Sequence, residues 1–259
     1  MTKMDNIKVF LDTQYLCKYK YKTECAALCR DTKFYADPTK LSVPHTEAKR
    51  NVQFCYGGSM SVAYNEAEPY CKVAVLDFAS ALKPGGCPEC GAFTQEENMC
   101  RCSNLFVALE AHNEYFDYHK RGPKDIYTNG ALYVPSVTMF KDDTDYTPVK
   151  EKQFDIIVCP APSTHCDPAR INNRAMGIVK LAAHRGVDVL ILGAWGCGAF
   201  GQDPSVIGKA FALALNKYNH FSKVIFAVRP TVGSWGANNY EPLAQSFCKA
   251  YTQDVQVEV

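Results

Sequence analysis

The segment Val187-Asp-Val-Leu-Ile-Leu-Gly193 continues into Ala194-Trp-Gly-Cys-Gly-Ala-Phe-Gly201, and a helical pattern begins at Pro204. The first segment is short, apolar and closed by glycine, which is typical of a buried strand. Asp203 is a good N-cap and Pro204 suits the first helical position, so we predict a helix over residues 204–218. A strand, a glycine-rich loop and a helix in this order indicate an α/β fold.

Three other segments have the same apolar character, namely Val73–Phe78, Asp155–Cys159 and Val224–Val228. Their side chains are almost continuously apolar rather than alternating, which favours a sheet covered on both faces. Residues 169–185 carry apolar side chains at helical spacing between two of these segments. Alternating strands and helices predict a three-layer α/β/α sandwich with a mixed, largely parallel sheet.

Residues 131–149 have a different pattern. Ala131–Val134 and Val137–Phe140 are predicted as two strands separated by a turn at Pro135. The polar run Asp142-Asp-Thr-Asp145 is predicted as the tip of a hairpin.

The N-terminal part of the chain carries no strong strand pattern, and we expect one or two helices between Phe10 and Tyr35. We therefore expect a single domain in which an N-terminal helical extension, residues 1–68, packs on a core formed by residues 69–259.

Composition limits the classes of function. Hydrophobic residues make up 47% of the 259 residues, which is enough for a sizeable core. The chain has 28 basic and 27 acidic residues and a net charge of +1, which argues against binding to nucleic-acid backbones. No apolar stretch approaches membrane length and no signal peptide is visible, so we expect a soluble, cytoplasmic protein without membrane or sequence-specific nucleic-acid partners.

Thirteen cysteines are present. Because several lie in apolar patterns and no export signal is visible, we expect free thiols rather than a disulfide framework. Cys87-Pro-Glu-Cys90, with Cys100 and Cys102, resembles half of a zinc site. However, Cys100 and Cys102 fall in an expected helix, where residues two apart face away from each other. We therefore predict no metal site.

The loop 193–201 is a candidate binding site. Its glycines expose successive backbone N–H groups ahead of a helix N-terminus, an arrangement that binds phosphate or diphosphate. Phe200 offers a ring for stacking on a sugar or base. A glycine-rich connection packed by its aromatic residues is the alternative. Pro160-Ala-Pro-Ser163 follows another predicted strand, and either shapes the same pocket or is a structural turn.

A second candidate site combines Pro84-Gly-Gly-Cys87 with Gln95-Glu-Glu97, and a spacer of seven residues separates the two segments. Glycines let the backbone approach a ligand closely. Of two adjacent carboxylates in a closed site, one tends to hold a proton near neutral pH, as glycoside cleavage requires. Asp77 ends the preceding strand at the carboxyl edge of the sheet, where ligands bind in open α/β folds. An ordinary turn followed by an acidic helix start is the alternative.

With these motifs, the chain resembles the microbial-type poly(ADP-ribose) glycohydrolases, a branch of the macrodomain fold. The matching segments are Val75–Ser80, Pro84–Cys87, Gln95–Glu97 and Gly193–Gly201. The family signature is three glycines, a short spacer and Gln-Glu-Glu. This chain departs from it at Cys87, which replaces the third glycine, and Asp77 stands where bacterial relatives often carry Asn.

The resemblance implies hydrolysis of the ribose–ribose O-glycosidic bond of ADP-ribose polymers, with ADP-ribose as product and no cofactor. Glu97 would be the general acid and base, and Glu96 its orienting partner. Asp77 would accept a hydrogen bond from the adenine amino group. The implied ADP-ribose site consists of Asp77, Phe78, Gly85, Gly86, Cys87, Gln95, Gly196, Cys197, Gly198, Ala199, Phe200 and Gly201.

Three other functions fit the same sequence. The chain could remove single ADP-ribosyl groups from ADP-ribosylated protein, or bind ADP-ribose without cleaving it. Intact Glu96 and Glu97 favour hydrolysis, because a binding module needs no paired acid. A zinc-dependent hydrolase using the Cys87 pair is the third alternative, and it predicts sensitivity to chelators.

Overall fold

One mixed sheet runs through the part of the chain that the computed structural model describes, residues 2–46, 51–163, 166–230, 238–252 and 255–257. Its strands are β1 (Lys33–Tyr35), β2 (Asn51–Tyr56), β3 (Val73–Asp77), β4 (Ala131–Lys141), β5 (Pro148–Val158), β6 (Val189–Leu192), β7 (Lys223–Val228) and β8 (Val255–Val257). They lie in the order β1-β4-β5-β3-β6-β7-β2-β8.

The helices occupy the segments between these strands. They are α1 (Lys3–Tyr19), α2 (Lys22–Asp31), α3 (Ser59–Glu66), α4 (Gln95–Cys102), α5 (Leu105–Ala111), α6 (Asn113–Lys120), α7 (Pro168–His184), α8 (Pro204–Tyr218) and α9 (Tyr240–Ala250), with short 3-10 helices η1 (Pro38–Lys40) and η2 (Pro88–Cys90). As predicted, α8 begins at Pro204, and the Asp203 carboxylate accepts a hydrogen bond from the Ser205 N–H at 2.8 Å.

The sheet is largely parallel, as predicted. Strands β5, β3, β6, β7, β2 and β8 pair in parallel, whereas β1 and β4 add an antiparallel edge. The four apolar runs predicted as strands correspond to β3, β6, β7 and the last part of β5, and the register pairs Ala74 with Asp155 and with Leu190.

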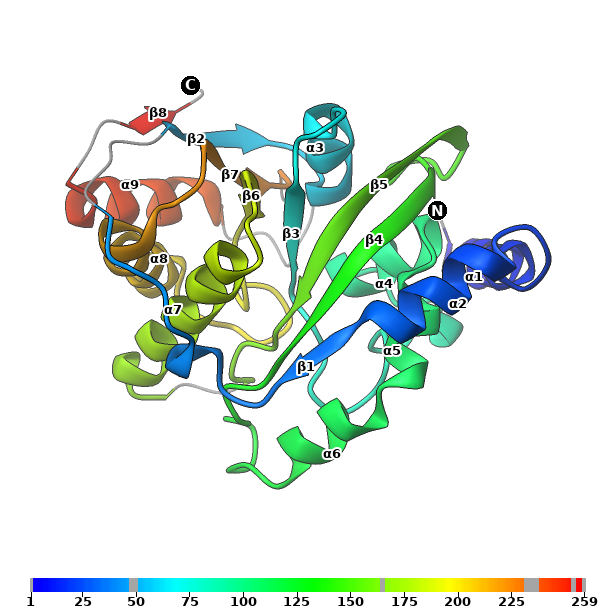
Figure 1. Cartoon of the computed structure of the whole chain (residues 1–259), viewed down its shortest axis with the longest axis horizontal. Coiled ribbons are helices and arrows are strands. Elements are labelled where there is room, and N and C mark those ends of the chain that lie inside the picture. The colour runs from blue at the N-terminus through cyan, green and yellow to red at the C-terminus, as the bar shows by residue number, and fades with distance from the viewer. Residues whose placement is uncertain (1, 47–50, 164–165, 231–237, 253–254, 258–259) are drawn as a thin grey trace.

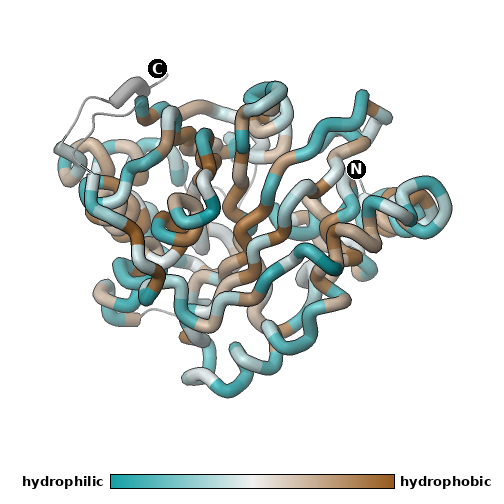
Figure 2. The backbone as a smooth tube through the Cα atoms, in the orientation of Figure 1, coloured by the Kyte–Doolittle hydropathy of each residue, from teal (hydrophilic) through white to brown (hydrophobic). Residues whose placement is uncertain are grey.

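Helices cover both faces of the sheet, which gives the three-layer fold (Figure 1). Alternate strand residues enter two separate cores. Ala74 and Leu76 pack in the core covered by α7, α8 and α9, whereas Val73 and Val75 pack in the core covered by α1 to α6. Figure 2 shows the hydrophobic residues along the central strands and hydrophilic residues mainly on the outer turns.

The prediction of two strands separated by a turn at Pro135 is wrong, because β4 is one strand with a bulge. Its register to β5 shifts between Val134 and Val137, and Ser136 has a φ of +55°. The Ser136 N–H donates to the Asp155 carboxylate at 2.8 Å, and the Tyr133 hydroxyl donates to the same carboxylate. A buried side chain of the neighbouring strand therefore satisfies the backbone that the bulge frees. The hairpin tip after β4 is confirmed.

The first 68 residues contribute more to the sheet than the sequence indicates. They form the predicted helices α1 and α2, but also β1 at one edge and β2 between β7 and β8. Residues Val52 and Phe54 of β2 are fully buried, and the Phe54 ring stacks on Phe226 with centroids 4.5 Å apart. The division of the chain at residue 68 stays a prediction about its organisation.

Helix α1 is fixed to the core beside the candidate carboxyl site. The buried Lys141 ammonium pairs with Asp12 at 2.7 Å and donates to the Thr13 hydroxyl at 2.7 Å. The Asn6 side chain donates to the Gly91 carbonyl at 3.1 Å, in the segment that joins η2 to α4. The N-terminal helices therefore support the loop that precedes the predicted catalytic glutamates.

Across the described residues, no helix has both the length and the apolar character needed to cross a bilayer.

The placement of β2 predicts the effect of truncating its central aromatic side chain. Phe54→Ala removes a fully buried ring and should lower the free energy of unfolding by about 3–5 kcal/mol. Tyr70→Ala, at a residue that is 105% exposed, should change it by less than about 0.5 kcal/mol. Urea denaturation of both variants checks this, and equal effects would place residues 51–56 outside the core.

Candidate active site

The Gln95 side chain fixes the start of α4 to the end of β3. Its Oε1 accepts a hydrogen bond from the Phe78 N–H at 2.7 Å, and its Nε2 donates to the Leu76 carbonyl at 2.8 Å. The same Nε2 donates to the Ser59 hydroxyl at 3.0 Å. Gln95 thereby satisfies the backbone where β3 leaves the sheet, and it brings the next two residues of α4 against that strand end.

Three carboxyl groups meet at this point. Asp77 is 0% exposed, Glu96 3% and Glu97 6%. Asp77 follows Val73 and Val75 on the same face of β3, because strand residues two apart share a face. That face is covered by α4, which carries both glutamates. Asp77 is therefore fully buried on the α4 side, and its expected contact with an adenine amino group stays a prediction.

The two glutamates are held by different donors. Glu96 Oε2 accepts from the Ser80 N–H at 2.7 Å. Glu97 Oε1 accepts from the Cys87 N–H at 3.2 Å, and its Oε2 accepts from the Thr94 hydroxyl. Each oxygen of Glu97 thus has a fixed partner, so the direction of this carboxyl is defined by the loop in front of α4.

Burial keeps protons in this group of acids. It raises the pKa of Asp77 well above its usual range, with the nearby Glu97 charge adding to the effect. Burial and then the Asp77 charge also raise the pKa of Glu96. Both Asp77 oxygens and Glu96 Oε1 are buried without a hydrogen-bond partner among the described residues. Burial therefore favours the protonated forms of Asp77 and Glu96.

The glycine turn covers the carboxyls closely. Gly85 and Gly86 have φ values of +65° and +71°. A Cβ on Gly86 would lie 2.4 Å from Glu97 Oε1 and 3.3 Å from Glu96 Oε2. Glycine is therefore needed at residue 86 both for its conformation and for the approach to the acids. Cys87, in contrast, has a φ of −146°, which any residue adopts, so the third glycine of the signature is replaced without strain.

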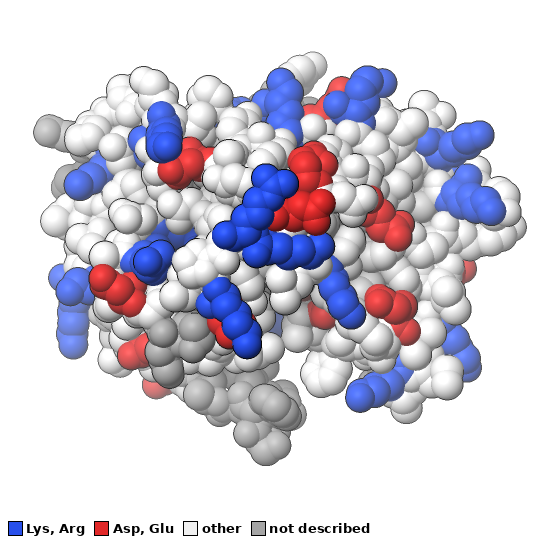
Figure 3. All heavy atoms as spheres, turned by 90° about the horizontal axis from the view of Figure 1, so that it is seen from below, with Lys and Arg blue, Asp and Glu red and all other residues white. Residues whose placement is uncertain are grey.

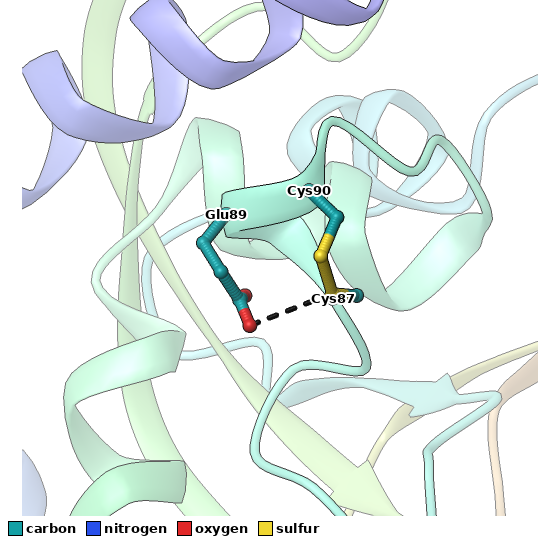
Figure 4. A group of neighbouring side chains, drawn as sticks. All are labelled: Cys87, Glu89 and Cys90. Atoms are coloured by element: carbon teal, nitrogen blue, oxygen red, sulfur yellow. Dashed lines mark hydrogen bonds between the residues drawn. A yellow bond between two sulfur atoms is a disulfide. The ribbon is translucent and has the colours of Figure 1, made fainter.

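Cys87 and Cys90 form a disulfide, which corrects the expectation of free thiols at these positions. Figure 4 shows the disulfide at η2, with the Glu89 carboxyl 3.4 Å from Cys87 Sγ. These three residues are the group in the described chain whose spacing could suit a metal ion, but their two sulfurs are bonded to each other. The other eleven cysteines are free, and Cys100 and Cys102 are buried on α4.

The loop between β6 and α8 is tied to the loop after β5. The buried Trp195 donates from Nε1 to the Cys159 carbonyl at 2.9 Å, and Gln202 donates to the Pro162 carbonyl at 2.8 Å. Gly196 has a φ of +77°, and a Cβ there would lie 2.5 Å from the Ala161 Cβ. The segment Pro160–Ser163, predicted either to shape the pocket or to be a turn, therefore supports the glycine loop directly.

The tip of the glycine loop meets no other described residue closely. Among the residues that the structure describes, no atom lies within 4 Å of a Cβ built on Gly198 or Gly201. Within the described chain, the N–H groups of Gly198, Ala199 and Phe200 donate to no other group. Three free amides in sequence, ahead of the α8 N-terminus, form the kind of nest that binds anionic oxygens.

Phe78 joins the two candidate sites. Its N–H is bound by Gln95 beside the carboxyls, and its ring atom Cζ lies 2.9 Å from where a Gly193 Cβ would be. The rings of Phe78 and Phe200 both pack partly against the core covered by α7 to α9. Cys197 is half-buried in the same way, and burial raises the pKa of its thiol to about 12.

Sequence reasoning missed several supporting residues. Thr94 precedes Glu97 by three residues, a capping-box spacing that could have identified it. Ser80 lies within a matching segment but acts through its N–H group. Arg174 gave no signal: it is buried on α7, and its guanidinium donates to the Pro160 carbonyl at 2.9 Å and the Ile126 carbonyl at 2.7 Å.

A cavity of about 600 Å³ lies elsewhere, between α2 and the β4–β5 pair. Arg30, Ser136 and Gln153 are among its lining residues, and none of the predicted site residues reaches it. The candidate active site therefore consists of the three buried carboxyls and the free amides of residues 198–200.

The family model of the microbial-type poly(ADP-ribose) glycohydrolase (PARG) catalytic domain matches residues 5–142. The chain belongs to this family. The matched region includes β3, the Gly85–Gly86 turn and α4 with both glutamates, and ends before the glycine loop at 193–201. No curated protein sequence matches the chain significantly.

Solved structures show that the PARG fold extends over nearly the whole chain. The poly(ADP-ribose) glycohydrolase of Thermomonospora curvata bound to the inhibitor ADP-HPD is 24% identical, with a TM-score of 0.79 over 96% of this chain and 100% of that chain. The enzyme of Deinococcus radiodurans in complex with ADP-ribose is 25% identical, with a TM-score of 0.72 over 87% of this chain and 96% of that chain. Both confirm the predicted macrodomain-like α/β fold.

The close approach of Gly86 predicts a loss of PARG activity on substitution. Gly86→Ala places a methyl group 2.4 Å from Glu97 Oε1, so the carboxyl or the turn must move. We expect hydrolysis of poly(ADP-ribose) to fall by about a factor of 100 or more. Gly186→Ala is the matched control, because its φ is +67° and no atom lies within 4 Å. It should cost about 1–2 kcal/mol of stability and leave activity intact; equal losses of activity would contradict the steric argument.

The buried Asp77 carboxyl predicts a pH-dependent stability. Above about pH 4, the unfolded chain releases a proton that folded Asp77 keeps, so the free energy of unfolding falls as pH rises until the folded-state pKa is passed. Asp77→Asn lacks this proton. Urea denaturation should therefore find the variant gaining stability relative to the parent protein as pH rises above about 4. Parallel stability curves over the whole range would show that Asp77 is not a raised-pKa group.

Proposed function

We propose that this chain hydrolyses the ribose–ribose O-glycosidic bond of poly(ADP-ribose) and releases ADP-ribose, with Glu97 as general acid and base. The observation that carries the proposal is the buried group of three carboxyls, in which Glu97 is directed by the Cys87 N–H and the Thr94 hydroxyl. Family membership and the ADP-ribose bound in the Deinococcus radiodurans enzyme support it.

Cleavage would begin with proton transfer from the Glu97 carboxyl to the departing ribose oxygen. The bond between that oxygen and the anomeric carbon breaks, and the electron pair leaves with the oxygen. The anomeric carbon becomes oxocarbenium-like and is captured by water, whose proton returns to Glu97. One water is consumed, the leaving ribose gains a hydroxyl group, and the released ADP-ribose carries the oxygen of the water. Glu97 is protonated at the end of the cycle, as it was at the start.

Glu96 and Asp77 would position Glu97 during this cycle. Glu96 is fixed by the Ser80 N–H at 2.7 Å, and its neighbouring Asp77 has no hydrogen-bond donor in the described chain. Burial of Glu96 and Asp77 favours their protonated forms, because few hydrogen-bond donors are available there to stabilise a carboxylate. We assign both as positioning residues for Glu97.

The ADP-ribose unit would lie between the two loops. The free amides of Gly198, Ala199 and Phe200 suit its diphosphate, and the tight Gly85–Gly86 turn would allow its terminal ribose to approach Glu97. We propose ring contacts from Phe78 and Phe200, which flank the glycine loop, and supporting contacts from Gln95, Gly196, Cys197 and Gly201. Every step described uses carboxyl groups, water and backbone amides, so the proposal requires no cofactor.

The substrate is proposed to be the ADP-ribose polymer, with ADP-ribosylated protein as the second candidate partner. Figure 3 shows basic and acidic side chains interspersed on one face of the molecule, in keeping with the net charge of +1. Recognition of a polyanion would therefore depend on local contacts rather than on a general positive field. We also propose a cytoplasmic location, which the eleven free cysteines support, since free thiols persist in reducing compartments.

Glu97→Gln tests the assignment of the acid. The amide keeps the shape of the side chain but cannot donate the proton, so hydrolysis of labelled poly(ADP-ribose) should fall by about 10²- to 10⁴-fold. Calorimetry should find the affinity for ADP-ribose largely unchanged.

The control is Glu110→Gln, since Glu110 is an exposed glutamate on α5, outside the proposed site. It should retain activity. Release of ADP-ribose by Glu97→Gln at a rate near that of the parent protein would remove Glu97 from this role.

A further inference from the structure

Phe93 lies in the segment that joins η2 to α4, one residue before Thr94. Its ring is 75% exposed. The next residue, Thr94, is also exposed, and its hydroxyl donates to Glu97 Oε2. An aromatic side chain therefore stands in solvent one residue from the group that directs the acid.

The segment that carries Phe93 is firmly held. The buried Arg101 guanidinium donates to the Ala92 carbonyl, and Asn6 donates to the Gly91 carbonyl at 3.1 Å. Gly91 has a φ of +73° and would bring a Cβ within 2.4 Å of the Lys3 carbonyl oxygen. On the other side, the Cys87–Cys90 disulfide closes η2. The ring is thus presented on a fixed backbone rather than on a free loop.

The other arm of the glycine turn carries a similar pair of exposed groups. Leu82 is 47% exposed, and Lys83 forms no ion pair with any described residue. The N–H groups of Leu82 and Lys83 both donate to the Ser80 hydroxyl, at 3.2 and 3.1 Å. In the chain, Leu82 and Lys83 therefore come directly before the turn that covers Glu97, and Phe93 follows it.

The chemistry of the proposed reaction indicates which part of the substrate would contact Phe93, Leu82 and Lys83. An acid must touch the oxygen that leaves, so the leaving group lies on the Glu97 side of the cleaved bond, away from the nest that would hold the diphosphate. In a polymer the leaving oxygen belongs to a ribose that bears an adenine. In an ADP-ribosylated protein it belongs to an amino-acid side chain, which carries no base.

We infer that Phe93 forms a leaving-group subsite that stacks the adenine of the next ADP-ribose unit, with Leu82 beside it and Lys83 near that unit's diphosphate. This inference rests on the proposed glycohydrolase function and adds a substrate class to it. The subsite favours polymer over single ADP-ribosyl groups on protein, because only the polymer places a base next to the cleaved bond.

Binding in the Glu97→Gln background tests the subsite without turnover. The ligands are ADP-ribose, which fills only the proposed nest side, and a two-unit ADP-ribose oligomer, which also reaches Phe93. Phe93→Ala should weaken oligomer binding by about 5- to 150-fold, which is ~1–3 kcal/mol of stacking at 1.36 kcal/mol per factor of ten, and leave the affinity for ADP-ribose unchanged. Phe93→Trp should restore the oligomer affinity, whereas a merely structural role would not be rescued by a larger ring.

Tyr70→Ala is the matched control, since Tyr70 is also an exposed aromatic residue but precedes the amino end of β3, whereas the carboxyls lie at its carboxyl end. It should change neither affinity. Equal effects of Phe93→Ala on both ligands, or none on the oligomer, would overturn the subsite while leaving the glycohydrolase proposal intact. Failure of ADP-ribose itself to bind, together with no release of ADP-ribose from polymer by the parent protein, would overturn both.

Discussion

Three carboxyl groups share a space that holds too few donors to stabilise them all as anions. Asp77, Glu96 and Glu97 are buried at the end of β3, and Asp77 has no hydrogen-bond donor in the described chain. Asp77 and Glu96 favour their protonated forms, because burial and the charge of neighbouring carboxyls oppose their ionisation. The rest of the site encloses these acids and fixes the direction of the Glu97 carboxyl.

The fold meets this constraint with backbone and amide groups rather than with counter-charges. Gln95 closes the end of β3, the Ser80 and Cys87 N–H groups each bind one glutamate, and the Gly86 backbone covers both. A lysine or arginine at the same place would stabilise the anions and remove the protons. The buried cations near the site, Arg101 and Arg174, instead donate to backbone carbonyls and hold loops.

Much of this arrangement could be predicted from the sequence, because its elements carry strong local patterns. Val73–Phe78 and Val224–Val228 are apolar throughout, and only a central strand covered on both faces needs that. Strand β2 was missed because Asn51–Tyr56 lacks such a run, and its short polar–apolar alternation is a weaker strand signal. Its place in the sheet depends on the stacking of Phe54 on Phe226, a contact distant in sequence.

Other features could not be predicted because they depend on a partner elsewhere in the chain. Pro135 indicates a turn by itself, whereas the β4 bulge forms because Asp155 on the neighbouring strand accepts the Ser136 N–H. Asp77 indicates a ligand contact by its position at a strand end, but the face it occupies is decided by α4. The spacing of Cys87 and Cys90 is equally suited to thiols, zinc or a disulfide.

The backbone angle of Cys87 has a consequence for how members of this family are recognised. Gly85 and Gly86 are held at positive φ, whereas residue 87 has a φ of −146° and contributes to the acid through its N–H group. The chemical requirement is therefore for two glycines and a free amide, and any residue except proline meets the third position. A search pattern that demands three consecutive glycines would overlook chains such as this one, and one that excludes only proline there would retain them.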